Sequence, residues 1–313
     1  MTLSKIVLIA NPKAGRKGSG ALEDAVSLLK RHFETTVVYT RKPGHATEIS
    51  SEFGGCDETL LAVCGGDGTI FETINGLPPA GLLGLLPGGT ANVITRELGI
   101  STDIREAAKI LITGAARSFD TGFLRHPGFS NPGEASGSPN PDAKSASKGM
   151  RFFMVAGFGL DAHVASRVHW LPKKILGQYA YHLETVMQYP FYDPPNISVI
   201  VDGKNSYQGQ FALIANLRRY GGNLFFAPSA RPDDGLLDLV LFRNVGPHSI
   251  LKGGYGAISG RGVPLDIAHR IQGKRFDLSF DKPIPFQLDG EVFPAISNAA
   301  IDIMPNSLKM VVP

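Results

Sequence analysis

Three glycine-rich loops follow short apolar strands early in this chain, and this pattern restricts the fold more than any other feature. The loops lie at residues 11–18, 65–69 and 87–92, and a helical segment follows each of them. Strands that alternate with helices predict a parallel sheet with helices on both faces. Ligands of such sheets bind beyond the carboxyl ends of the strands. We therefore expect all three loops to line one edge of the sheet.

The pattern of apolar residues changes from α/β to mostly β along the chain. In the first part we expect strands at 6–10, 35–40, 59–64 and 81–86, and helices at 21–32, 48–53, from 70 onward, 91–98 and 104–113. Later strands are expected at 151–155, 196–201, 208–216, 237–242, 275–280, 284–288 and 299–304, with helices at 175–188 and near 247–259. Short strands separated by turns predict an antiparallel β-sandwich or a barrel-like domain.

These patterns predict two domains in the 313 residues. Residues 1–125 form an α/β nucleotide-binding domain with a parallel-type sheet, and residues 150–299 form a mainly antiparallel β-rich domain. Residues 126–149 are rich in Pro, Gly and Ser and are expected to form a flexible loop. The last strand, at about 300–313, has the option of returning to the first domain.

Composition narrows the class of protein further. The 31 basic and 28 acidic residues give a net charge of +3, which argues against a protein that binds nucleic acid through bulk charge. Cys56 and Cys64 lack the spacing of a metal site, and they fit reduced thiols in a cytosolic protein. No apolar run reaches the roughly 18–20 residues that span a bilayer. We expect a cytoplasmic protein that is at most peripheral to a membrane.

The loop Gly65-Gly66-Asp67-Gly68-Thr69 has the chemistry of a phosphate-binding turn. Glycines let backbone N–H groups approach anionic oxygens, and the start of a helix adds a partial positive charge. A carboxylate in this position fits if Asp67 holds a divalent cation or its water shell. Thr90 and Asn92 add short polar groups at the next helix start. The alternative is an ordinary tight turn in which the aspartate binds local donors.

Together, the loops and later motifs resemble the diacylglycerol kinase catalytic-domain family, which includes bacterial lipid kinases, sphingosine kinases and ceramide kinases. The first motifs are Asn11-Pro12 with Gly15, Gly65 to Thr69, and Leu86 to Asn92. The similarity continues, in the same order, through 120–122, 157–161, 220–222, 227–228, 233–238 and Asp289-Gly290-Glu291. The resemblance therefore spans nearly the whole chain.

This resemblance implies an N-terminal nucleotide domain, a C-terminal β-sandwich and an active site in the cleft between them. It implies ATP- and Mg²⁺-dependent phosphorylation of a lipid hydroxyl, as in diacylglycerol or a sphingoid base. Phosphoryl transfer needs positioning, cations near the phosphates and a base for the attacking hydroxyl. The matching nucleotide contacts are Asn11, Thr40, Gly65, Gly66, Asp67, Gly68, Thr69, Ile70, Phe71 and Thr90.

The resemblance also assigns roles to acidic residues. Glu291 matches the family's proton acceptor, with Asp289 beside it, and the sequence leaves open which of the two is the base. Asp120 lies where the chain leaves the first domain, which is expected to border the cleft. Asp234, with the backbone carbonyls of Arg231 and Leu236, matches a structural site for Mg²⁺ or Ca²⁺. Ordinary solvated turns are the alternative for both acidic segments.

Access to the lipid is less defined by the sequence. The segment 167–174 mixes cations with the only tryptophan and suits either a membrane interface or a solvated basic turn. The segment 175–192 suits either an acyl-chain tunnel or core packing. Val93, and residues 153–156 with no asparagine, depart from the family pattern and leave the acceptor lipid open. The oligomeric state is open too, with a homodimer as one option.

Two other functions fit the same motifs. An NAD kinase shares a Gly-Gly-Asp-Gly-Thr loop on a related fold, although the motifs of the second domain argue against it. A non-catalytic lipid-binding or regulatory protein could keep the fold, although Asp67, Asp289 and Glu291 are all present. An assay that offers NAD and a lipid as competing acceptors separates these alternatives.

Overall fold

The computed structural model describes residues 3–12, 19–55, 58–78, 81–126, 149–160 and 192–313. These residues belong to two compact units, which we describe separately. The first unit holds the described residues up to Thr121, together with 149–151 and 305–313. The second unit holds 122–126 and the described part of 152–304. Only the first and last residues of the predicted loop at 126–149 are among the described residues. The predicted helix at 175–188 lies entirely outside them.

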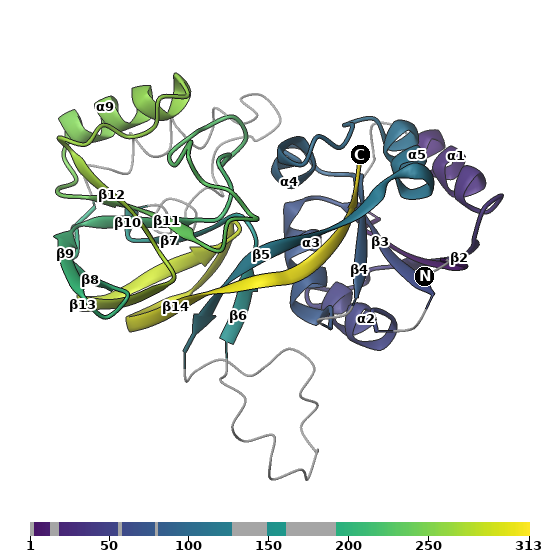
Figure 1. Cartoon of the computed structure of the whole chain (residues 1–313), viewed down its shortest axis with the longest axis horizontal. Coiled ribbons are helices and arrows are strands. Elements are labelled where there is room, and N and C mark those ends of the chain that lie inside the picture. Colours follow the sequence, from purple (N-terminus) through teal and green to yellow (C-terminus); the bar gives the residue numbers. More distant parts are fainter. Residues whose placement is uncertain (1–2, 13–18, 56–57, 79–80, 127–148, 161–191) are drawn as a thin grey trace, which may run out of the picture. The chain divides into compact units, whose positions relative to one another are not determined.

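The first unit contains the parallel sheet that the sequence predicted. Its strands lie in the order β2, β1, β3, β4, and the C-terminal part of β14 pairs in parallel with β4. Strands β1, β3 and β4 are buried along most of their length because helices cover the sheet, whereas the edge strand β2 has no buried residue (Figure 1). Their bounds are Lys5–Ala10 (β1), Glu34–Tyr39 (β2), Thr59–Gly65 (β3) and Leu82–Pro87 (β4).

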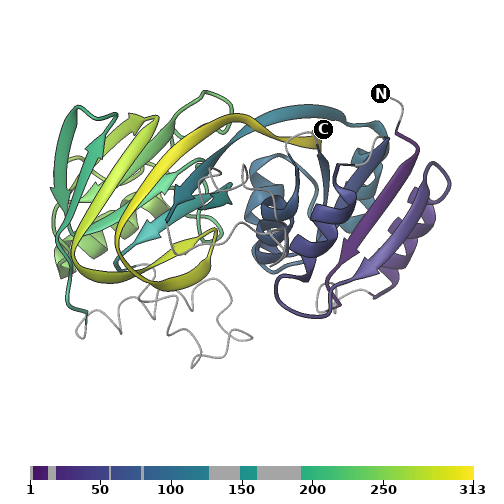
Figure 2. The ribbon, with the colours of Figure 1, turned by 90° about the horizontal axis from the view of Figure 1, so that it is seen from below.

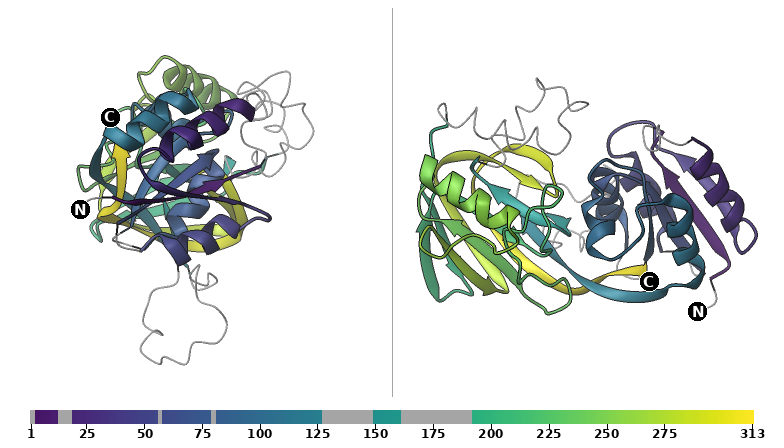
Figure 3. Two further views of the ribbon diagram at one scale, coloured as in Figure 1. Left: turned by 90° about the vertical axis from the view of Figure 1, so that its right-hand side faces the viewer. Right: turned by 90° about the horizontal axis from the view of Figure 1, so that it is seen from above.

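Helices lie on both faces of this sheet, as expected. Helices α1 and α5 pack together on one face, and α2 and α3 pack together on the other (Figure 1; Figure 3, left). Helix α5 begins where Asp103 accepts hydrogen bonds from the backbone N–H groups of Arg105 and Glu106, which is an N-cap. The helices are Ser19–Leu29 (α1), His45–Phe53 (α2), Asp67–Gly76 (α3), Val93–Glu97 (α4) and Ile104–Thr113 (α5).

Two long strands carry the chain from one unit to the other. The chain leaves the first unit along β5 (Ala115–Arg125), which the sequence analysis missed, and returns along β14 (Glu291–Val312). The two strands pair with each other, and Figure 2 shows them side by side. The strand predicted at 299–304 was too short, whereas the last strand expected at about 300–313 agrees with the C-terminal end of β14. Strand β14 continues past Pro305 and Asn306, where the backbone φ of Asn306 is 52°.

The second unit is antiparallel, as predicted. Its strands follow the order β12, β11, β10, β7, β13, β14, with β8 and β9 extending from β13. Several predicted boundaries were wrong: 151–155 spans two strands, and 208–216 contains the end of β9 and the whole of β10. Strand β12 was missed. Strand β6 (Gly149–Phe152) pairs with β5 and leads from the first unit into the second. The bounds of the second unit's strands are Val155–Phe158 (β7), Ile197–Val201 (β8), Asn205–Gly209 (β9), Phe211–Ala215 (β10), Leu237–Phe242 (β11) and Ala268–Gly273 (β12).

The strands predicted at 275–280 and 284–288 are one bulged strand, β13 (Arg275–Leu288). Its first half pairs with β8 and its second half with β7, and its register against β14 shifts between Ser279 and Ile284. Pro283 lies at this shift and has no backbone N–H to donate, so the ladder is interrupted without the strand ending. The core beside it is aromatic, with the ring of Phe158 stacked 5.6 Å from that of Phe280 and 5.9 Å from that of Phe286.

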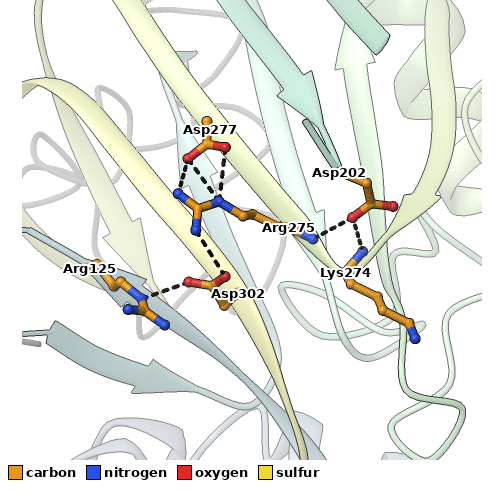
Figure 4. A network of polar contacts seen from close by, with 6 residues as sticks. All are labelled: Arg125, Asp202, Lys274, Arg275, Asp277 and Asp302. Atoms are coloured by element: carbon orange, nitrogen blue, oxygen red, sulfur yellow. Dashed lines mark hydrogen bonds and ion pairs between the residues drawn. The ribbon is translucent and has the colours of Figure 1, made fainter. Parts of the chain in front are cut away.

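A network of charged residues crosses the strands of the second unit (Figure 4). The guanidinium of Arg275 binds both carboxylate oxygens of Asp277 and lies 3.9 Å from the carboxylate of Asp302. Arg125 on β5 donates to Asp302 at 2.7 Å. Because Arg275 and Asp302 are direct partners in the β13–β14 register, these ion pairs favour that register over a one-residue slip.

Helix α9 (Pro247–Ile258) lies across the outside of the strands of the second unit (Figure 3, right). It confirms the helix predicted near 247–259. None of the helices in the described part of the chain is both long and apolar enough to cross a bilayer.

Candidate functional site

The loop at Gly65 to Thr69 lies between the end of β3 and the first turn of α3. Gly66 is the N-cap of α3, with an extended backbone, and its carbonyl accepts hydrogen bonds from the N–H groups of Thr69 and Ile70. The first N–H groups of a helix have no acceptor within the helix, and the aligned peptide dipoles make this end positive. The structure therefore has a helix start where the sequence predicted one, and the binding of an anion there stays a prediction.

The loop that follows β4 packs directly against this turn. The N–H of Gly88 donates to the carbonyl of Gly65 at 2.9 Å. A Cβ built on Gly89 would lie 2.6 Å from the Cα of Gly66, and one built on Gly66 would lie 3.3 Å from the Cα of Gly89. Glycine is required at position 89 because a Cβ there would meet the facing backbone, and a Cβ at position 66 would be a tight fit. The sequence analysis explained the glycines of these loops by the close approach of a ligand instead.

Asn92 fixes the shape of the second loop. Its backbone is left-handed, with φ 47°, and its side chain accepts from the N–H of Gly89 at 2.8 Å and donates to the carbonyl of Gly89 at 3.0 Å. Asn tolerates this conformation better than most residues. The turn leaves Thr90 exposed at its tip, where a hydroxyl is available to a ligand.

The carboxylate of Asp67 points toward the start of α4. It accepts hydrogen bonds from the N–H groups of Val93 at 3.3 Å and Ile94 at 3.4 Å, and so caps that helix. Burial raises the pKa of Asp67, while these two backbone donors act in the opposite direction. These donors lie 26 and 27 residues further along the chain, so they are not the local donors of the tight-turn alternative, and a role of Asp67 in holding a cation stays a prediction.

The ends of the other two strands lie at the same edge of the sheet. Ala10 at the end of β1 is in register with Cys64 of β3 and with Tyr39 of β2. The side chain of Asn11 donates to the hydroxyl of Thr69 at 3.2 Å, which ties the first loop to the second. The expectation that the described parts of the loops share one edge is confirmed. Residues 13–18 lie outside the described residues.

Two predicted nucleotide contacts have side chains that face the core. Ile70 and Phe71 are 1% and 4% exposed, since they lie on the inner face of α3. Any contact between these two residues and a nucleotide would have to use the backbone. Thr40, by contrast, is partly exposed just beyond β2, and its N–H donates to the carbonyl of Ala10 at 3.0 Å.

Asp289 and Glu291 lie on a tight hairpin in the second unit, but in different surroundings. Leu288 and Glu291 are direct partners across the hairpin, and Asp289 and Gly290 form its turn with φ of 52° and 91°. Left-handed backbone at both positions is typical of a two-residue hairpin loop. Asp289 is 4% exposed, whereas Glu291 is exposed. The idea of two solvated carboxylates is therefore wrong for Asp289.

The carboxylate of Asp289 anchors the segment before β7. It accepts hydrogen bonds from the N–H groups of Phe153, Met154 and Val155 at 2.7, 2.8 and 2.9 Å. Backbone donors of this number and length hold a carboxylate strongly. Of the two acidic residues of the hairpin, Glu291 is therefore the one whose carboxylate is open to solvent.

Sequence reasoning missed Gln287, which is completely buried beneath the same hairpin. Its side-chain oxygen accepts from the N–H of Gly290 at 2.6 Å, and its amide nitrogen lies 3.5 Å from the hydroxyl of Tyr220. The signal available in the sequence was a polar residue in the otherwise apolar predicted strand 284–288, two positions before Asp289.

Asp120 lies at the point where β5 runs beside β14. It is 2% exposed, and it accepts a hydrogen bond from the N–H of Asn306 at 2.8 Å. The next residues, Thr121 and Ser307, have hydroxyls 2.8 Å apart. These contacts give Asp120 a structural role in joining the two long strands. Its role in catalysis stays a prediction.

The predicted second metal site centres on an exposed turn. The carboxylate of Asp234 accepts from the N–H of Leu236 at 3.0 Å, which is the solvated turn that the sequence analysis held as the alternative. Nearby Asp238 is buried against Ser229 and Gln272, and burial raises its pKa. Among the described residues, no group of three or more His, Cys, Asp or Glu side chains could hold a metal ion. A site built from Asp234 and the carbonyls of Arg231 and Leu236 stays a prediction.

Comparisons with known proteins match both units. Residues 5–124 match the model of the diacylglycerol kinase catalytic domain, and residues 154–312 match that of the YegS C-terminal NAD kinase beta sandwich-like domain.

Curated relatives and solved structures agree with these matches. A diacylglycerol kinase of Bacillus subtilis (strain 168) is 28% identical over 91% of this chain and 88% of its own length. A diacylglycerol kinase of Staphylococcus carnosus (strain TM300) is 26% identical over 91% of this chain and 87% of its own length. A solved diacylglycerol kinase structure from Bacillus anthracis str. Sterne covers 100% of this chain and 98% of its own, with a TM-score of 0.71 at 22% identity, and supports the fold.

Proposed function

Because the chain belongs to the diacylglycerol kinase catalytic-domain family, we propose that it transfers the γ-phosphate of ATP to the hydroxyl of a lipid such as diacylglycerol or a sphingoid base. The observation that carries the proposal is the packing of the Gly65 to Thr69 loop against the 87–92 loop at the carboxyl edge of the sheet. Two glycine turns at one edge are suited to a polyphosphate.

In this proposal ATP lies on the loops of the first unit. The start of α3, the hydroxyl of Thr90 and the side chain of Asn11 would donate hydrogen bonds to phosphate and ribose oxygens. Thr40 and the backbone of residues 65–71 complete the proposed contacts. The donors present fit an anion, since the start of α3 is positive and three of the five residues of its loop are glycines.

Mg²⁺ would neutralise the charge that develops on the phosphates. It keeps several waters in proteins and commonly uses only one or two carboxylates beside the substrate's phosphates. Asp67 fits a role of this kind through water, because its carboxylate already caps α4. Binding of Ca²⁺ or Mg²⁺ at Asp234, with the carbonyls of Arg231 and Leu236, is part of the same proposal as a separate structural site.

Glu291 is the proposed general base. Its carboxylate would accept the proton of the lipid hydroxyl as that oxygen bonds to the γ-phosphorus and the bond to the β–γ bridging oxygen breaks. Asp289 would serve as a positioning residue, because its three backbone hydrogen bonds fix the hairpin that carries Glu291. A lipid acceptor also implies a cytoplasmic enzyme that works at a membrane surface.

A phosphotransfer screen with labelled ATP and a total lipid extract, read by mass spectrometry, tests the proposal. We expect a phosphorylated lipid, and at least about a hundredfold lower turnover for Glu291→Gln and Asp67→Asn. Glu23→Gln, at an exposed position of α1, is the matched control and should keep full turnover. Phosphorylation of NAD in preference to every lipid, or full activity of both site variants, would contradict the proposal.

A further inference from the structure

Helix α9 exposes its large apolar side chains and buries its small ones. Leu251, Tyr255 and Ile258 are 69%, 66% and 67% exposed, whereas Ser249, Gly253, Gly256 and Ala257 are buried. The three large residues are spaced i, i+4 and i+7, so they form one face. A helix of a water-soluble protein normally turns such a face toward its core.

Close packing of the inner face explains this arrangement. A Cβ on Gly253 would lie 2.7 Å from the ring of Phe242, and one on Gly256 would lie 2.2 Å from the carbonyl of Gly262. Only glycine fits at these two positions, so rotating α9 to bury its large residues would force side chains into the strands. The outward direction of the apolar face is therefore fixed by the packing.

The loop after α9 extends this surface. Leu265 is 64% exposed, and the ion pair between Lys252 on α9 and Asp266 holds its loop to the helix. These four apolar side chains, which we term the α9 patch, are the most exposed large apolar residues in the described part of the chain. A group of exposed large apolar side chains is typical of a site of interaction.

The segment that contains α9 and the loop after it is rich in basic residues. Residues 243–270 contain Arg243, Lys252, Arg261 and Arg270 but only one acidic residue, Asp266, so four minus one gives +3. This equals the net charge of the whole chain, 31 minus 28. The one carboxylate is paired with Lys252, and Arg243 and Arg261 are exposed.

We propose that the α9 patch docks the protein on the surface of a membrane that contains anionic lipids. This inference rests on the proposed function, in which the acceptor is a lipid. An exposed apolar helix face with cations beside it suits the boundary between headgroups and acyl chains, and tyrosine is favoured there. A second copy of the chain is a poorer occupant, because an isologous dimer would bring this cationic surface against its own copy.

Vesicle binding of the full chain, measured by co-sedimentation without ATP, tests the assignment. The vesicles are phosphatidylcholine alone and phosphatidylcholine with phosphatidylglycerol. We expect the wild type to prefer the anionic vesicles, and the variant Leu251→Gln/Tyr255→Gln/Ile258→Gln to bind them at least about tenfold more weakly. Gln keeps the helix propensity of α9. Ile200→Thr, at an apolar position of β8 that is 43% exposed, is the control and should bind normally.

Removing one positive charge tests the electrostatic contribution to vesicle binding. Arg261→Gln should weaken binding to the anionic vesicles about fivefold and leave binding to phosphatidylcholine alone unchanged. The proposal is overturned if the triple variant binds within about twofold of the wild type, or if the wild type binds neither vesicle. It is also overturned if the triple variant loses self-association by light scattering while its vesicle binding is unchanged, since the patch would then join two copies.

Kinase activity is measured separately, on a short-chain diacylglycerol that is soluble as monomers. The triple variant should phosphorylate it as the wild type does, because the α9 patch lies outside the proposed nucleotide loops and the Glu291 hairpin. Absence of all kinase activity in the wild type would contradict the proposed function, while vesicle binding still decides the role of the α9 patch.

Discussion

The strongest structural prediction concerns Asp289→Asn. In the wild type one carboxylate oxygen accepts from two backbone N–H groups and the other from one, at 2.7–2.9 Å, in a buried position. The amide keeps one oxygen acceptor but turns an NH₂ group toward the remaining N–H. One charge-assisted hydrogen bond is lost and a buried donor faces another donor, which we expect to cost about 2–4 kcal/mol.

Asn is the appropriate substitution because it tolerates the left-handed backbone of position 289, where φ is 52°. A loss of that size corresponds to a melting temperature lower by roughly 5–15 °C for a unit of this length. Differential scanning calorimetry gives the shift, and hydrogen exchange of a peptide covering residues 153–158 locates it. Glu291→Gln, at an exposed position on the same hairpin, is the control and should melt like the wild type.

The two variants also separate the structural role of Asp289 from the proposed catalytic role of Glu291. We expect Asp289→Asn to lose stability and activity together, and Glu291→Gln to lose activity alone. If Asp289→Asn melts within about 1 °C of the wild type and residues 153–158 keep their protection, the carboxylate does not hold this segment and our argument for its role is refuted.

Three further predictions test the packing and the buried groups. Gly89→Ala should lower the free energy of unfolding, measured by urea titration, by about 1–3 kcal/mol and raise the KM for ATP, because its Cβ would lie 2.6 Å from the facing backbone. The control is Gly20→Ala on α1, whose Cβ would have nothing within 4 Å and which should be neutral or slightly stabilising in the same titration. Burial raises the folded-state pKa of Asp238, so the free energy of unfolding should fall as the pH rises from its ordinary pKa of 3.8 through the raised value, and Asp238→Asn should flatten that part of the curve; an unchanged slope would contradict it. Burial raises the pKa of Cys64 to about 11, so iodoacetamide at pH 8 should label it, by peptide mapping, only after unfolding, and rapid labelling of the native protein would show that β3 opens.

The sequence predicted the fold class well because local patterns decide it. Apolar strands followed by glycine turns and helices specify a parallel sheet, and the first unit contains it with small boundary errors. The errors in the second unit have nonlocal causes. Strand β13 was divided in the prediction because Pro283 interrupts the pattern, whereas pairing with β8, β7 and β14 keeps the strand continuous.

The candidate site was predicted residue by residue, but the environment of each residue was not. The sequence motifs identify Asp67, Asp120 and Asp289 as acidic site candidates but do not distinguish their surroundings. The structure distinguishes them, since each carboxylate accepts from backbone N–H groups of a segment distant in sequence. Glu291 differs because its side chain is exposed.

The sequence by itself determined the order of β1 to β4, of the helices between them and of the glycine turns, and so the edge where the loops of the first unit meet. Periodicity and turn chemistry act over a few residues, and a single chain displays them directly. Only the tertiary structure decided that Asp289 is buried on three N–H groups while Glu291 faces solvent, and that α9 turns its leucine, tyrosine and isoleucine outward. Those outcomes depend on which distant backbone fills the space beside each side chain, and no local pattern encodes that.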